Sequence, residues 1–308
     1  MLKSFWNKRP HLCGSIVIFM LLSAILGVVA HGQTPTTSIT TIKVDLASFV
    51  ASQYVHKYYP EFQWHAVDYM ALHDINGSVK AYAFIFAKVS SDINSSEDLQ
   101  LHIQKKFAML WQAKAGQGNA KPDSDSAEQA RARVIEAEEA LYNYRNLGTV
   151  ITGATSDSEL ILNCFRGLPQ FWVNAETTDE AATLQRFGKA LQIVRIIMIT
   201  PMDFRLVATK VSETSPLLRD LQSSEKTIFP DTAYVLESRV DKVRVFSDVK
   251  KERQAMAVRK QQRLRAFEPA ERAEHEKALE DRARAMADKW RYYREMLSNN
   301  KKAREVAN

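Results

Sequence analysis

Disulfide bonds cannot hold this fold together, because the chain of 308 residues contains only Cys13 and Cys164. Cys13 lies in an apolar N-terminal segment, so Cys164 has no partner in the remainder of the chain. Packing of side chains must therefore supply the stability. Cys164 lies among apolar neighbours in "LILNCFRGLP", a context typical of a buried cysteine.

The sequence also lacks the motifs of common cofactor and metal sites. It has no glycine-rich phosphate loop, and its seven histidines form no ligand pair with a nearby carboxylate. The stretch "HEKAL" begins like a zinc-protease helix, but Leu279 stands where the second histidine is needed. We therefore expect no cofactor and no metal. A thiol hydrolase that joins Cys164 to His56, His65 or His73 is the enzymatic alternative.

The N-terminus resembles an export segment. Residues 1–12 contain three basic residues and no acidic one, and residues 13–30 are uncharged and mostly apolar. This layout is typical of a signal peptide. We expect residues 1–32 to be such a peptide, cleaved after Ala30 or Gly32, or else a membrane anchor. In both cases the rest of the chain is exported, to the periplasm or the extracellular space.

Residues 42–112 predict a first helix-plus-hairpin unit. Between Asp45, the expected helix cap, and Pro60, the expected stop, bulky residues recur at intervals of three and four. These residues are Leu46, Phe49, Val50, Tyr54 and Tyr58. Residues 64–72 and 79–89 then alternate between bulky and small or polar side chains, which indicates two strands.

The segment "DINGS" joins these two strands, and its Asn76-Gly77 pair favours a tight hairpin turn. A calcium loop built on Asp74 and Asn76 would need a third oxygen ligand before the glycine and a closing glutamate, and both are missing. We therefore interpret the turn as structural. The second strand should place Tyr82, Phe84 and Phe86 on one face and its alanines on the other.

Residues 125–247 predict a second α+β unit. Its expected elements are a helix, two short strands, a turn with an aromatic edge, a short helix, a central strand and an antiparallel partner. They cover residues 127–144, 149–155, 161–165, 166–173, 177–188, 191–199 and 204–209. Residues 234–246 are compatible with either a strand or the start of a long helix.

Residues 248–308 predict a charged helical tail, which Pro269 divides into two pieces. Residues 249–308 hold 17 Lys and Arg against 10 Asp and Glu, whereas residues 33–248 hold 22 against 26. The acidic residues argue against nucleic acid as a partner and favour a salt-bridged, solvated helix. A heptad-like seam suits a coiled coil or docking on the body. The seam consists of Leu279, Ala283, Met286, Trp290, Tyr293 and Leu297.

Residues 45–89 resemble the cystatin-like prodomain modules of secreted bacterial proteins, of the streptopain propeptide and PepSY type. The residues that carry the resemblance are Asp74, Asn76 and Gly77 in the turn and Ala81 and Tyr82 in the strand. The resemblance implies a helix lying across an antiparallel sheet. It also implies a non-catalytic module that inhibits or chaperones a peptidase or binds in the envelope, although no peptidase follows in this chain.

We therefore predict an exported α+β protein with two helix-plus-antiparallel-sheet, cystatin-like units and a charged helical tail. The expected function is non-enzymatic binding of a protein such as a peptidase, with the tail mediating self-association or attachment. The candidate contact residues are Trp64, Tyr69, Tyr82, Phe171 and Trp172. The alternatives are the thiol hydrolase centred on Cys164 and a tail that binds anionic polymers or membrane surfaces.

Overall fold

A computed structural model describes most of the chain. The described residues are 40–60, 63–118, 125–178, 180–210, 232–237 and 242–307. The predicted export segment, residues 1–32, lies outside them. Among the described residues, no helix has the length and apolar character needed to cross a membrane.

One sheet runs through the described part of the molecule, in the order β4-β3-β2-β1-β5-β6-β7-β8. Its strands are β1 (Trp64–His73), β2 (Val79–Lys88), β3 (Leu147–Gly153), β4 (Ile161–Arg166), β5 (Leu191–Thr200), β6 (Asp203–Lys210), β7 (Tyr234–Glu237) and β8 (Lys242–Val245). All neighbouring pairs are antiparallel except β1 and β5, which are parallel and meet at His73 and Ile197.

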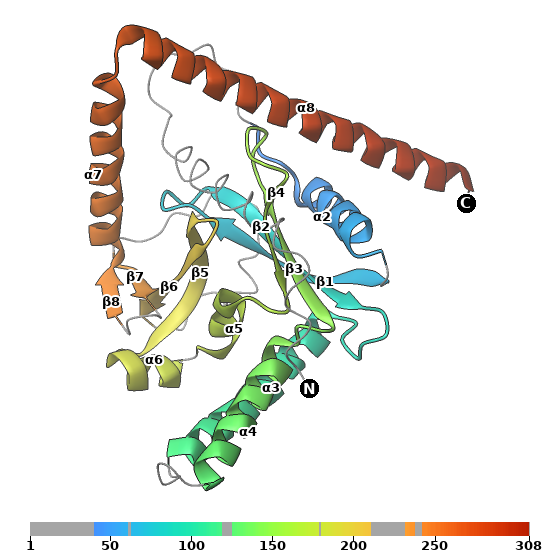
Figure 1. Ribbon diagram of the computed structural model, residues 1–308, viewed down its shortest axis with the longest axis vertical. Helices are drawn as coiled ribbons and strands as arrows, with labels where there is room; N and C mark the ends of the chain where they lie inside the picture. The colour runs from blue at the N-terminus through green and yellow to red at the C-terminus, as the bar shows by residue number, and fades with distance from the viewer. Residues whose placement is uncertain are drawn as a thin grey trace.

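Helices cover both faces of this sheet (Figure 1). They are α2 (Val44–Tyr58), α3 (Ser96–Gly118), α4 (Asp125–Tyr142), α5 (Gln170–Thr177), α6 (Glu180–Phe187), α7 (Phe246–Arg265) and α8 (Pro269–Ala307). Helices and a largely antiparallel sheet confirm the α+β class, and the two-part helical tail is present as predicted.

The hairpin of β1 and β2 confirms the predicted strands and turn. The Asp74 carboxylate accepts hydrogen bonds from the backbone N–H groups of Asn76 at 2.8 Å and Ser78 at 2.9 Å. Gly77 has φ of 80°, a conformation that favours glycine. The Asp74 side chain therefore closes the turn itself, which is a structural role.

We expect Asp74→Ala to lower the free energy of unfolding by about 1–2 kcal/mol, because two backbone donors lose their acceptor. Urea denaturation measures this loss. Since the carboxylate serves the turn, added calcium should leave the thermal midpoint of the unmodified protein unchanged; a calcium-dependent rise would contradict this assignment.

The two faces of β2 are also as predicted. Tyr82, Phe84 and Phe86 pack in the core beneath α2, whereas the alanines and Ile85 join the larger core beneath α3, α4 and α5. A third core cluster, around Phe246 and Val249 of α7, covers the end of the sheet formed by β5 to β7.

Helix α2 is present as predicted, with Leu46 and Val50 buried, but it differs from prediction in its N-cap and in the rest of its buried face. Lys43, not Asp45, occupies the N-cap position, and it makes no side-chain capping bond. The residues in the core are Leu46, Ala47, Val50, Ala51 and Val55. Helix α2 packs against the strands and also against α8, whose Tyr293 ring lies 6.4 Å from the Phe49 ring, measured between centroids.

Two further predictions need correction. The segment "QFWV", expected as a turn with an aromatic edge, begins helix α5. Strands β3 and β4, which we assigned to the second unit, extend the first half of the sheet: β3 hydrogen-bonds to β2, and β4 hydrogen-bonds to β3. The antiparallel α3 and α4 pair is therefore an insertion between β2 and β3, and it projects from the sheet (Figure 1).

Candidate functional site

A pocket lies at one end of the sheet, beside α2, and we call it the Trp64 pocket. It has a volume of about 270 Å³ and lies between the C-terminal end of α2 and the adjoining ends of β1 to β4. Gly148 on β3 keeps it open: a Cβ atom built there would lie 3.8 Å from the Trp64 ring. The space exists because no side chain occupies this position beside Trp64.

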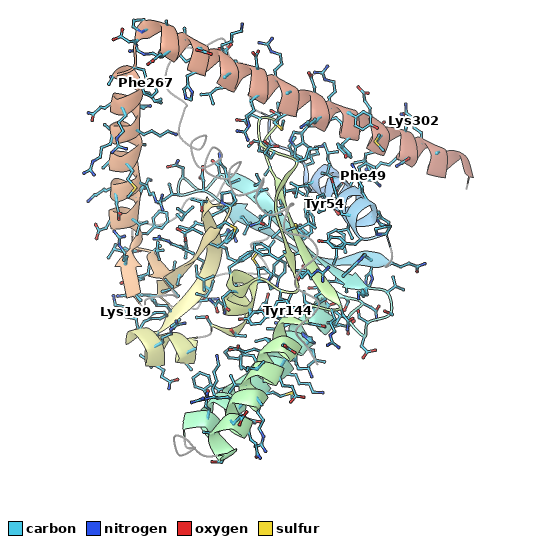
Figure 2. All side chains as sticks on the ribbon, viewed as in Figure 1. Phe49, Tyr54, Tyr144, Lys189, Phe267 and Lys302 are labelled. Atoms are coloured by element: carbon cyan, nitrogen blue, oxygen red, sulfur yellow. The ribbon has the colours of Figure 1, made fainter. Side chains whose placement is uncertain are left out.

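Aromatic rings form the walls of the Trp64 pocket. The rings of Tyr59 and Trp64 meet edge to face, with their centroids 6.4 Å apart. The remaining aromatic lining residues are Phe86, Tyr144 and Phe165. Figure 2 labels Tyr144, which follows α4 and lies at the lower end of β3 and β4. Such a surface suits an apolar or aromatic ligand.

Three basic residues line the same pocket. Lys88 ends β2 and lies over the Trp64 ring, with its Nζ 5.7 Å from the ring centroid. Arg166 ends β4, and Arg145 lies in the turn that leads into β3. No aspartate or glutamate of the described chain lines the pocket. The site is therefore apolar inside and positively charged at its edge.

Cys164 also lines the Trp64 pocket, where it faces α2. Its Sγ lies 3.5 Å from the Tyr54 hydroxyl, a distance at which either group can donate a hydrogen bond. Burial raises the pKa of Tyr54 far above its ordinary value, and the Cys164 contact adds to this effect. Tyr54 is therefore a neutral phenol at physiological pH and provides no base for the thiol.

The structure does not bring Cys164 into hydrogen-bond distance of a histidine within the described residues. His65 pairs with Ala87, whose side chain lies on the opposite sheet face from the pocket-lining Phe86. His73 lies at the far end of β1, next to β5. The described residues also contain no group of three or more His, Cys, Asp or Glu side chains that could hold a metal ion.

The five candidate contact residues occupy different environments. Tyr82 and Trp172 are fully buried in the core, so a partner cannot reach them in this structure, and Phe171 is buried except where it lines a second cavity, described below. Tyr69 is half-buried and packs on Phe84 beneath α2. Trp64 alone lines the pocket described above. The aromatic pattern in the sequence therefore belongs mainly to the core.

The six seam residues of α8 are all buried or half-buried. Trp290 enters the core beneath α2 and donates a hydrogen bond from Nε1 to the Ser158 carbonyl oxygen at 2.9 Å. Arg282 forms an ion pair with Glu159 at 2.6 Å. The helix thus docks on α2 and the β3–β4 turn (Figure 1), which leaves this seam unavailable for a coiled coil in the docked state.

A second cavity lies on the other side of Phe165 and Arg166, beside α5 and the β5–β6 hairpin, with a volume of about 610 Å³. Its acidic residue is already engaged: Asp203 pairs with Arg205 at 3.2 Å. Phe171 and Phe204 stack within it at 4.3 Å. This cavity is larger than the Trp64 pocket, but its charged pair and its stacked rings already contact each other.

We regard the Trp64 pocket as the better candidate site, because no aspartate or glutamate of the described residues lines it and its two arginines form no ion pair within the described part of the chain. Sequence analysis singled out Trp64 and Cys164 but missed Lys88, Arg145 and Arg166, which lie far apart in the chain and form no local motif. Comparison of the chain with protein-family models, with curated proteins and with solved structures found no match in any of the three.

Proposed function

We propose that the protein is an exported, non-enzymatic binding protein and that it binds a small, largely apolar ligand in the Trp64 pocket. The pocket itself is the observation that carries this proposal: five aromatic residues surround a space of about 270 Å³ that opens beside a glycine. Its volume of about 270 Å³ lies just below the range of about 300–1,000 Å³ for small-molecule sites. The ligand should therefore be small.

The surroundings of the pocket favour binding over catalysis. Cys164, the nucleophile of the alternative hydrolase, contacts the half-buried Tyr54 and not a base. The export part of the proposal is supported by the basic and then apolar composition of residues 1–30. A partner protein bound through a sheet face is less well supported, because helices cover both faces.

A neutral amphiphile tests the proposal directly. We expect octanamide to bind at one site per chain, measured by titration calorimetry, and to slow the alkylation of Cys164 by iodoacetamide, measured on the Cys164 peptide by mass spectrometry. Gly148→Leu should reduce octanamide affinity by about tenfold or more, because its side chain enters the pocket, and tenfold corresponds to about 1.4 kcal/mol.

Gly148→Ala is the matched control. Its Cβ atom would meet its nearest neighbour, the Phe165 carbonyl oxygen, at 3.7 Å, an ordinary contact, so folding and most of the affinity should be retained. The proposal fails if octanamide does not bind, or if it binds Gly148→Leu as well as the unmodified protein. Turnover of any ester or peptide that is lost in Cys164→Ser would instead favour the thiol hydrolase.

A further inference from the structure

Basic side chains gather at the edge of the Trp64 pocket, although the body of the chain is acidic on balance. The body of the chain, residues 33–248, has fewer basic than acidic residues, 22 against 26. Even so, Lys88, Arg145 and Arg166 all line one pocket of about 270 Å³, and no aspartate or glutamate of the described residues lines it. The charge at this site is thus opposite in sign to that of the body as a whole.

Backbone pairing between neighbouring strands brings these cations together. Lys88 is paired across the hairpin with Trp64, and its backbone N–H donates to the Asn146 carbonyl oxygen at 3.0 Å, which holds the Arg145 turn against the end of β2. Arg166 is paired with Gly148 across β3 and β4. Three strand ends and one turn thus converge on the glycine that opens the pocket.

The two arginines are also exposed and have no carboxylate partner among the described residues. Arg205 and Arg282, by comparison, lie 3.2 Å and 2.6 Å from the carboxylates of Asp203 and Glu159. Like charges gathered at the mouth of an apolar cleft repel one another and concentrate anions there. A guanidinium group presents paired N–H donors that match the two oxygens of a carboxylate.

We infer that the ligand of the Trp64 pocket is an amphipathic monoanion: an apolar body packed among the aromatic rings and a carboxylate head held by Arg145 and Arg166. This inference rests on the proposed function, since it names the ligand class of the same pocket. Trp64, with Lys88 over its ring, lies where the apolar and the charged parts of the site meet.

Three probes of equal chain length separate the head group from the tail. We expect octanoate to bind about tenfold more tightly than octanamide at low ionic strength, with octylammonium the weakest, since two or three exposed charge contacts each contribute modestly. In about 1 M salt, where the Debye length falls to about 3 Å, the preference for octanoate should largely disappear. Calorimetry and protection of Cys164 from alkylation give two readouts.

The double variant Arg145→Gln/Arg166→Gln tests the named residues. Octanoate affinity should fall about tenfold, to the level of octanamide, while octanamide affinity stays the same, because only the head contacts are removed. Arg259→Gln/Arg284→Gln is the matched control: it removes the same charge from exposed positions on α7 and α8, which do not line the pocket. Both variants alter exposed side chains and should fold.

The outcomes are distinct. Equal affinity for octanoate and octanamide would overturn the anion preference while leaving the proposed binding function intact. Binding of neither probe would overturn both. A tenfold preference for octanoate that survives in Arg145→Gln/Arg166→Gln, or that is lost equally in the control, would overturn the assignment to these two arginines.

Discussion

Trp290→Ala is expected to lower the free energy of unfolding by about 3–5 kcal/mol and to release helix α8 from the body. Trp290 is only 1 % exposed, and it is the α8 side chain that enters the core beneath α2. Its replacement removes that packing, leaves a cavity and deprives the Ser158 carbonyl oxygen of its 2.9 Å hydrogen bond. Urea denaturation measures the loss, and limited trypsin digestion detects the released helix through its many basic residues.

Trp111→Ala is the matched control for this prediction, because the same chemical change is made at a tryptophan that is 60 % exposed on α3. Its effect should stay within about 0.5 kcal/mol, as is usual for surface positions. Trp290→Phe keeps most of the buried area and should lie between the two. If Trp290→Ala and Trp111→Ala were equally stable, the docking of α8 would not depend on this residue.

Local patterns predicted the hairpin well because its determinants are local. The strands alternate with a period of two, and Asn76-Gly77 supplies the positive φ that the turn requires. The packing of helix α2 was harder to predict. The apolar stripe of a helix shows how wide its buried surface is, but it does not show which element packs on each side of it. Here Phe49 faces α8 while Ala47 and Ala51 face inward.

Long-range pairing was beyond single-sequence reasoning. Strand β3 lies next to β2 although more than fifty residues, including α3 and α4, separate them in the chain. The candidate site also depends on long-range pairing. Its residues Trp64, Lys88, Arg145 and Arg166 come together only because the pairing of β1 to β4 places their adjoining ends side by side. No spacing in the sequence identifies such a set. Trp172 illustrates the converse, an aromatic residue that looks available for contact but is buried in the core.

Gly167→Ala is expected to destabilise the protein by about 2–5 kcal/mol and to deform the wall of the Trp64 pocket. Gly167 has φ of +77°, and a Cβ atom would lie 2.3 Å from the Tyr142 carbonyl oxygen and 2.7 Å from the Tyr144 ring. The glycine cannot move aside, because its N–H donates to the Leu147 carbonyl oxygen at 2.7 Å. The cost combines a left-handed conformation, about 1–2 kcal/mol, with overpacking, about 1–3 kcal/mol.

Gly188→Ala separates these two contributions. Gly188 has φ of +66°, but a Cβ atom there would meet nothing within 4 Å, so only the conformational cost of about 1–2 kcal/mol applies. The difference between the two variants in urea denaturation therefore measures the close approach of the β4 end to the Tyr142–Tyr144 segment. Gly167→Ala should also weaken octanamide binding, because Tyr144 is displaced, whereas Gly188→Ala should not. Equal stabilities would show that the Tyr142–Tyr144 segment yields freely, and the pocket wall would then not depend on Gly167.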